Sequence, residues 1–280
     1  MVDASAFNAY AGASNAAAGM AQRAWEQATG GLDLRTALVS AVELEAIYKR
    51  IVEQCGYYAA QAAVEYYETQ RATQAVASAY AATAAEGASS GLLAYDVMSY
   101  LLSPSWGLNI GAKAAQRTLE RGDSTLFANA QADPAHPKWA IIPHVGACDW
   151  CKMLGSRGFD YRSGQTASAQ RHSNCKCSVA VDFDTDNPQL EGYDPDAYLE
   201  AYQRHPEWSS RSGGKSGTRR KEGYGNAVEQ LGGYIKQASS FEELQNAFDI
   251  IQRNSAMFDG YGTQGAARLA RMVTAKAASL

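Results

Sequence analysis

The chain has 280 residues, a net charge of −4 and an apolar share of 46%, much of it alanine. Residues 211–280 carry ten Lys/Arg against six Asp/Glu, whereas residues 1–210 carry fifteen against twenty-three. An acidic body with a mildly basic tail is compatible with a nucleic-acid neighbour. It is not the pattern of a dedicated DNA-binding domain, which would be strongly basic throughout. Alanine favours helix and buries little surface, so we expect long helices with thin cores that need partners, although an ordinary helical bundle fits the composition equally well.

The start of the chain and its hydropathy bear on the compartment. Residues 1–5 lack the basic start and apolar run of a signal peptide. No run of about 18 apolar residues occurs, so we expect no membrane span. In a reducing cytoplasm, clustered thiols hold metal more often than they form disulfides.

The first half of the chain is predicted to be helical. Residues 3–29 form a weak, alanine-rich helix, and residues 33–72 form a longer one. In the longer helix, apolar residues recur at spacings of three and four, namely Leu44, Ile47, Ile51, Cys55, Tyr58, Ala62 and Tyr66. Helical pieces are also expected at residues 74–86, 91–102 and 108–121. Cys55 lies in the apolar stripe, so we interpret it as a small buried hydrophobic residue.

The middle of the chain has a different texture. Apolar or alternating runs at residues 139–142, 157–162 and 177–183 predict three short strands. The fold class expected is therefore α+β, with mainly α-helical arms flanking a small β-rich zinc-binding module. We expect a helical N-terminal arm, the module, a linker with a short helix and a helical C-terminal segment, over residues 1–107, 108–185, 186–225 and 226–280.

Two helix starts are predicted in the last third of the chain. Asp194 precedes Pro195, which suits a helix cap followed by a first-turn proline. Ser240 and Glu243 have the spacing of a capping box. The helix that follows this box is expected to bury Phe241, Leu244, Phe248 and Ile251.

Four of the five cysteines lie between residues 148 and 177. Cys148 and Cys151 form a CxxC pair, which presents two thiolates to one ion. His172, Cys175 and Cys177 supply three further donors, and zinc favours a tetrahedron of such sulfur and imidazole ligands. Four of these five donors suffice. We favour the CxxC pair with His172 and Cys175, because their spacing mirrors that of the first pair, and Cys177 is the alternative for the fourth place.

Other chemistries fit the cluster less well. A redox CxxC would follow a strand and open a helix, and it would leave three donors unexplained. Disulfides would need an oxidising compartment. A catalytic zinc site needs a nearby acid or base, and the zinc-deaminase signature is absent because His144 is followed by Val145 and Gly146. We therefore expect a closed structural zinc site that stabilises a module too small to fold on its own core, and no enzyme activity.

A second candidate site lies in the glycine- and serine-rich stretch 209–225. It carries five basic side chains that can contact nucleic-acid phosphates, namely Arg211, Lys215, Arg219, Arg220 and Lys221. A solvated linker is the simpler interpretation of the same composition.

The cluster and its flanking residues resemble a known family. The runs 139–143, 146–154, 156–163 and 172–177 are similar to the MuF-like minor capsid (phage head morphogenesis) proteins, in the version found in phages of actinobacteria. The resemblance covers residues 108–185. Many of those relatives have an arginine before the motif proline, where this chain has Ile142, so the role of that arginine is not carried over.

The resemblance implies a virion component present in few copies. Such a protein is made in the host cytoplasm and then lies in the capsid interior near the portal vertex. Its expected partners are the portal or the major capsid protein, with packaged phage DNA as a further candidate, and its expected role is capsid assembly or genome packaging and delivery. Some relatives carry a protease or toxin domain, but this chain shows no catalytic constellation. The alternative hypothesis is a zinc-dependent DNA-binding module that uses the basic C-terminal region.

Overall fold

The computed structural model describes residues 1–30, 38–102, 110–160, 175–203, 231–241, 243–244, 247–248, 251 and 264–280. The described part of the chain is mostly helical with one two-stranded sheet, which confirms an α+β composition. It divides into two compact units. The first unit comprises Met1–Ala24, Ile51–Ala88 and Ala112–Ser212, and the second comprises Trp25–Arg50, Ser89–Gly111 and Gly213–Leu280.

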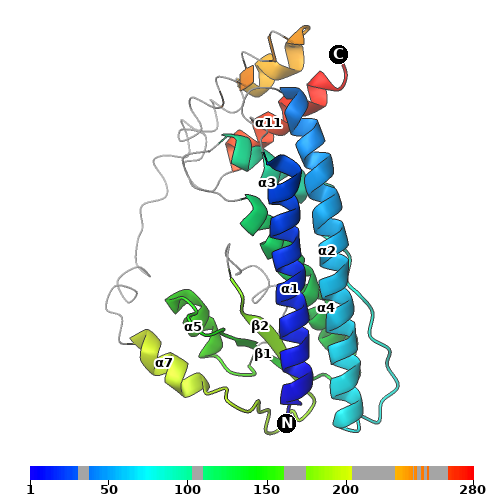
Figure 1. Cartoon of the computed structure of the whole chain (residues 1–280), viewed down its shortest axis with the longest axis vertical. Coiled ribbons are helices and arrows are strands. Elements are labelled where there is room, and N and C mark those ends of the chain that lie inside the picture. Colours follow the sequence, from blue (N-terminus) through cyan, green and yellow to red (C-terminus); the bar gives the residue numbers. More distant parts are fainter. Residues whose placement is uncertain are drawn as a thin grey trace. The chain divides into compact units, whose positions relative to one another are not determined.

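The larger parts of three long helices belong to the first unit: α1 (Ala4–Thr29), α2 (Leu38–Thr73) and α4 (Ile110–Ala132). Figure 1 shows them side by side. The rings of Tyr10 and Tyr66 stack with their centroids 5.1 Å apart. A Cβ added to Gly122 would lie 3.3 Å from the carbonyl oxygen of Ala59, so α2 and α4 approach through small residues. All three predicted helices are confirmed, and α4 continues past residue 121.

The sheet consists of two antiparallel strands, β1 (Lys138–Ile142) and β2 (Ser178–Asp182). Ile142 lies opposite Ser178, which fixes the register. These strands confirm two of the three predicted ones. The strand predicted at residues 157–162 is wrong as far as the described residues reach, because residues 156–159 form a turn. Glycine at position 158 has φ +62°, a left-handed conformation that a strand does not use.

The outer edge of β2 is covered by a tyrosine of α2. The hydroxyl of Tyr66 accepts a hydrogen bond from the amide of Val181 (3.1 Å) and lies 3.4 Å from the carbonyl oxygen of the same residue. Both main-chain groups of Val181 that face away from β1 therefore have a partner, as buried main-chain groups require. One side chain takes the place of a third strand at this position.

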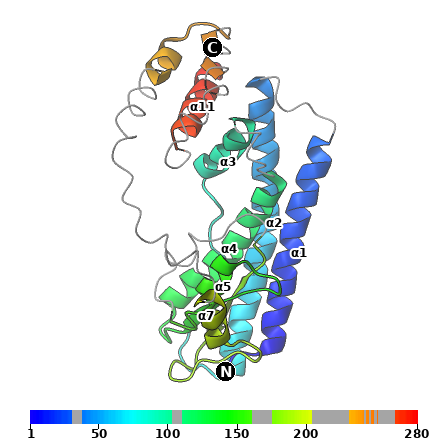
Figure 2. The same ribbon diagram turned by 90° about the vertical axis from the view of Figure 1, so that its left-hand side faces the viewer.

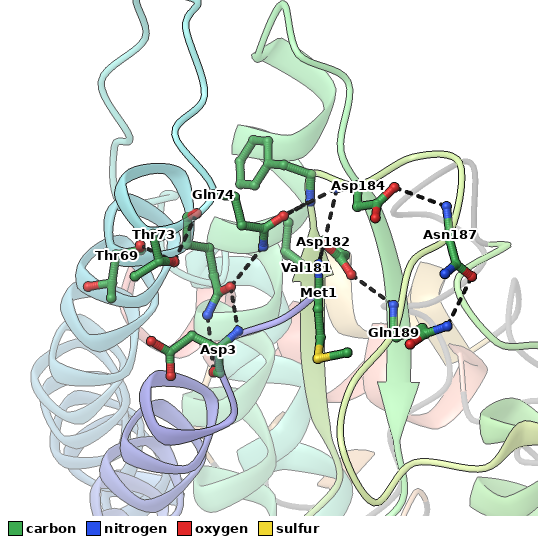
Figure 3. A network of polar contacts seen from close by, with 12 residues as sticks. Met1, Asp3, Thr69, Thr73, Gln74, Val181, Asp182, Asp184, Asn187 and Gln189 are labelled. Carbon is green, nitrogen blue, oxygen red and sulfur yellow. Dashed lines mark hydrogen bonds and ion pairs between the residues drawn. The ribbon is translucent and has the colours of Figure 1, made fainter.

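A polar network joins the end of α2 to the start of α1 and the end of β2 (Figure 3). The side-chain oxygen Oε1 of Gln74 accepts hydrogen bonds from the main-chain amides of Phe183 (3.0 Å) and Asp184 (3.2 Å). The fully buried carboxylate of Asp182 accepts from the amide of Gln189 (2.8 Å) and lies 3.4 Å from the amino group of Met1. Segments far apart in the sequence are thus fixed to one another.

The helix predicted at residues 74–86 is wrong. After α2 the chain runs without helix or strand from Val76 to Ser89. Side chains of α4 hold it there: the side-chain amide Nδ2 of Asn129 donates to the main-chain carbonyl of Thr83 (2.8 Å), and the Thr125 hydroxyl accepts from the main-chain amide of Ala85 (3.0 Å). These tertiary contacts override the helix preference of alanine.

In the second unit, α3 (Ser90–Leu102) packs against α11 (Gln264–Ala277) (Figure 2). The helix predicted at residues 91–102 is thereby confirmed, and α11 is a helix of the C-terminal segment. The buried side chains of α3 and α11 include Leu93, Met98, Leu269 and Val273. Near the start of α2, the Tyr48 hydroxyl donates to the buried carboxylate of Asp96 (3.1 Å). None of the helices in the described ranges has the length and apolar character of a membrane span.

The caps predicted in the last third are largely confirmed. Asp194 accepts from the amides at positions 196 and 197 at the start of α7 (Pro195–Gln203). The amide of Glu243 donates to Ser240, while the Glu243 carboxylate accepts from the amide of Ser239, one residue earlier than predicted. Leu244, Phe248 and Ile251 are buried as expected, but Phe241 is 59% exposed because it lies at the very start of that helix.

Candidate metal centre

The helix α5 (Asp149–Gly155) presents the first pair of cysteines. Cys148 is the residue before the helix, and its side chain is exposed. Its main-chain carbonyl accepts a hydrogen bond from the amide of Lys152 (3.0 Å). Cys151 lies in the first turn and is 2% exposed. The helix follows β1 through a turn in which the amide of Ala147 donates to the carbonyl of His144. The end of β1 therefore sets the position of Cys151. The CxxC pair thus does follow a strand and open a helix, so the expectation that this context is missing was wrong. The metal interpretation rests instead on the two further buried thiols that lie within 4.8 Å of Cys151.

Cys175 and Cys177 lie in the extended segment that enters β2. Both are buried, whereas Lys176 between them is exposed. Extended chain directs alternate side chains to opposite faces, so a Cys-x-Cys run at this place directs both sulfurs inward. The antiparallel register brings this segment to the end of β1, since Ser178 lies opposite Ile142. The two cysteine-bearing segments thereby meet at one end of the sheet.

The sulfurs of Cys151, Cys175 and Cys177 all lie within 4.8 Å of one another, and those of Cys151 and Cys175 are 3.6 Å apart. A disulfide would bring its sulfurs to about 2.0 Å. A tetrahedral ion with zinc–sulfur bonds of about 2.3 Å holds its sulfurs about 3.8 Å apart. The separations therefore fit three ligands of one metal ion, and the buried three-thiol group can hold such an ion.

Burial and mutual contact act on the ionisation of these thiols. Hydrogen bonds with the thiols of Cys175 and Cys177, together with burial, raise the pKa of Cys151 strongly. For Cys177 the hydrogen bond with Cys151 lowers the pKa, but contact with Cys175 and burial outweigh it and raise the pKa to about 12. The main-chain amide of His144 also donates to Cys177 and acts to lower its pKa. Burial and mutual contact therefore favour the neutral form of the Cys151 and Cys177 thiols.

Comparison with known proteins gives the family. The model of the family described as VG15 protein matches residues 1–205. The chain belongs to the VG15 family. This is a phage-related family, so the chain is a phage protein. Searches of curated proteins and of solved structures gave no match.

In this VG15-family protein, the matched region runs from α1 to the end of α7 and includes all five predicted donors. The structure brings Cys151, Cys175 and Cys177 together and leaves Cys148 exposed beside them. His172 lies outside the described residues, and so do the basic residues Arg211, Lys215, Arg219, Arg220 and Lys221.

Cys177 is the least expected member of this group, because its spacing from His172 differs from that of the CxxC pair. The signal for Cys177 was the period of two in a segment about to enter a strand, which places residues 175 and 177 on one face. The pairing of His172 with Cys175 stays a prediction, because residue 172 lies outside the described residues.

Gly155 is a further residue of the site, and no sequence motif marks it. A Cβ added to Gly155 would lie 2.7 Å from Cδ of Pro143 and closer still to its Cγ. Only glycine therefore allows the last turn of α5 to rest on the end of β1. The hydroxyl of Tyr193 donates a hydrogen bond to the main-chain carbonyl of Gly155 and so helps to fix the end of α5.

Proposed function

We propose that this phage protein is a structural minor capsid protein of the MuF-like, head-morphogenesis type, without catalytic activity. It acts inside the head near the portal vertex, in capsid assembly or in genome packaging and delivery. The resemblance of residues 139–177 to such proteins supports the assignment, as does membership of a phage-related family. The observation that carries the proposal is the buried group of three thiols, which joins α5 to the segment before β2.

The ion proposed for this group is zinc in a structural site. Sulfur-rich tetrahedral sites favour zinc, and such sites are closed by four protein ligands. Cys151, Cys175 and Cys177 supply three ligands, and Cys148 or His172 supplies the fourth. When bound, a structural zinc ion contributes on the order of 10 kcal/mol to folding. The chain's own residues align the two segments through the β1–β2 register and the packing of Gly155 on Pro143.

The long helices are the proposed partner surface. In the first unit, α2 exposes about half of the side chains of Tyr57 and Tyr58, and α1 exposes 46% of Met20. Tyrosine and methionine are enriched where proteins bind one another. In this proposal the portal or the major capsid protein covers these side chains, while the metal centre keeps the small sheet rigid beside the helices.

The test is the protein content of purified phage heads. We expect mass spectrometry to find the chain in few copies per DNA-filled head, cross-linked to the portal or to the major capsid protein. Phage carrying Cys151→Ser should incorporate much less of it, whereas Cys55→Ala, at a buried cysteine outside the thiol group, should incorporate it normally. Absence from purified heads, or normal infectious heads after deletion of the gene, would refute the proposal.

A second candidate function rests on the charge asymmetry, since residues 211–280 carry a net positive charge. In this alternative the basic stretch around Arg219, Arg220 and Lys221 binds packaged DNA through its phosphates. Such binding weakens steeply as salt rises. Neutralising these three residues should lower DNA affinity at low salt and reduce the salt slope by about 3. An unchanged affinity would leave the stretch as a linker.

A further inference from the structure

The geometry points to a conformational switch in the segment Gln74–Ser89, which we call the strap. In this inference the strap is held extended by α4 and, when released, continues α2 as a helix. It concerns neither the metal centre nor the virion role, and it rests on contacts within the first unit.

The composition of the strap favours a helix. Half of its sixteen residues are alanine, it contains no proline and its one glycine is Gly87. Alanine has the highest helix propensity of all residues. The strap directly follows the 36-residue helix α2, so its helical form needs no new nucleus, which is the unfavourable step in helix formation. The local sequence therefore favours a longer α2.

The observed conformation is extended instead. Side chains from Ala75 to Thr83 alternate between exposed and half-buried, with Ala77, Ala79 and Ala81 exposed and Ser78, Tyr80 and Ala82 half-buried. A period of two is the signature of extended chain. The alternation runs through the segment where the sequence alone predicts a period of 3.6.

Three side chains of α4 form hydrogen bonds with the main chain of the strap. Asn129 accepts from the amide of Thr83 (2.9 Å) and donates to the carbonyl of the same residue (2.8 Å). Thr125 accepts from the amide of Ala85 (3.0 Å), and Arg121 donates to the Ala85 carbonyl (3.1 Å). Asn129 and Thr125 are four residues apart in a helix, a rise of about 6 Å, and their partners Thr83 and Ala85 are two residues apart, which is close to 6 Å only in extended chain. The spacing of the α4 side chains therefore matches an extended strap and not a helical one.

Helix α2 holds the first part of the strap. Arg71 donates to the carbonyl of Ser78 and lies over the ring of Tyr80, 5.5 Å from its centroid. The Tyr80 hydroxyl reaches across to Asn129 (2.8 Å), and Glu68 accepts from the amide of Ala82. These contacts come from side chains, so they can be removed one at a time without deleting any part of a helix.

The junction between α2 and the strap is strained. Ala75 has φ +51°, a left-handed conformation that is unfavourable for a residue with a Cβ. The turn is otherwise a common helix ending, in which the amide of Val76 donates to the carbonyl of Arg71 (3.0 Å), and glycine is the usual residue at this place. Continuing the helix would relieve this strain and lengthen α2 by about 20 Å.

The central experiment measures the helical circular dichroism signal at 222 nm of the full chain. Asn129→Leu keeps the size of the side chain and removes its bonds to Thr83 and Tyr80, so it should raise the signal by the equivalent of about ten residues. Ala79→Pro is compatible with extended chain but not with helix. It should change nothing by itself and should abolish the gain in the Asn129→Leu background.

Two results of this experiment would overturn the switch. A fall in the signal of Ala79→Pro alone would mean that the strap is already helical in solution. A folded Asn129→Leu protein without any gain would mean that the released strap does not become helical.

A second variant covers the case in which Asn129→Leu fails to fold. Ala75→Gly relieves the left-handed strain, so it should stabilise the extended strap and slow deuterium exchange at the amides of Thr83 and Ala85 roughly fivefold. Unchanged or faster exchange at these two amides would contradict the strained junction and, with it, the switch.

Discussion

The sulfur of Cys151 lies 3.6 Å from the sulfur of Cys175, although 24 residues separate them in the sequence. One belongs to the first turn of α5 and the other to the segment before β2. Both side chains are almost fully buried. Two thiols at this distance are too far apart for a disulfide and close enough to share one tetrahedral ion. The contact therefore connects the stability of the small sheet to metal binding.

The first prediction is the loss of metal on Cys151→Ser. The purified wild-type protein should contain about one zinc per chain by elemental analysis, and the variant well below that, because the site loses one of its three buried sulfurs. The variant should also melt at a lower temperature, since binding free energy of a structural site is folding free energy. Treatment of the wild type with a chelator should lower its melting temperature in the same way.

The matched control is Cys55→Ala, at a buried cysteine of α2 outside the thiol group. Burial raises the pKa of the Cys55 thiol, so it stays protonated and unreactive. This variant should keep its zinc and lose only the packing of one sulfur. Equal metal content in wild type and Cys151→Ser would exclude the thiol group as the metal site.

The fourth ligand gives a second prediction. Cobalt(II) substituted for zinc shows thiolate charge-transfer absorption that grows with the number of coordinating sulfurs. If Cys148 closes the site, Cys148→Ser should reduce this absorption by about a quarter and His172→Ala should leave it unchanged. Metal content is measured alongside. Loss of metal by His172→Ala, with normal metal content in Cys148→Ser, would assign His172 as the fourth ligand. Normal metal content in both variants would mean that neither residue is the fourth ligand.

The sequence identified the elements whose pattern is local. The apolar stripe of α2 is visible at Leu44 and Tyr66, and the apolar run at residues 139–142 gave β1. Cys177 was within reach of the same reasoning, because the alternation of Cys175, Lys176 and Cys177 is itself a strand pattern. The strap was not. Its extended form depends on Asn129, which lies more than forty residues away, and no local propensity reports such a contact.

The third prediction concerns Gly155→Ala. The added methyl group would overlap Pro143, and the main chain must move because neither partner is the end of a flexible side chain. We expect a loss of about 1–3 kcal/mol in the free energy of unfolding and faster loss of metal to a chelator, since α5 carries Cys151. Urea unfolding and a chelation time course measure the two effects.

Gly12→Ala is the control for this substitution. Gly12 lies in α1, and a Cβ added to it has no neighbour within 4 Å. Replacing a glycine inside a helix by alanine should be neutral or should stabilise the protein by up to about 1 kcal/mol. A Gly155→Ala protein as stable as Gly12→Ala would show that α5 does not rest on Pro143.

The fourth prediction concerns the buried pair of Arg71 and Asp133, whose side chains are 6% and 0% exposed. The Asp133 carboxylate also accepts from the hydroxyl of Tyr67 (3.0 Å) and the amide of Ala135 (2.8 Å). Asp133→Asn leaves a buried guanidinium without its counter-charge and should cost about 3–5 kcal/mol. Combining it with Arg71→Met should restore part of that loss in urea unfolding. A double variant less stable than Asp133→Asn would contradict this account.

The last prediction follows from the hydroxyl of Tyr66. Burial raises the pKa of Tyr66 well above its usual value near 10, and the negative charges of Asp182 and Asp3 act in the same direction. The folded protein therefore keeps this hydroxyl neutral at pH values where the unfolded chain releases its proton. The stabilisation of the folded protein by the neutral Tyr66 hydroxyl is therefore fully present below about pH 10. It is lost as pH rises above that value towards the pKa of Tyr66 in the folded protein.

Tyr66→Phe removes that titration. Its free energy of unfolding should be lower than that of the wild type at neutral pH by about 1–2 kcal/mol, because Val181 loses its partner in the core. Above pH 10 the wild type should lose up to about 1.4 kcal/mol per pH unit more than the variant, so the two stability curves converge. Parallel curves between pH 9 and 11.5 would mean that Tyr66 is not the buried, titrating group that fixes the edge of β2.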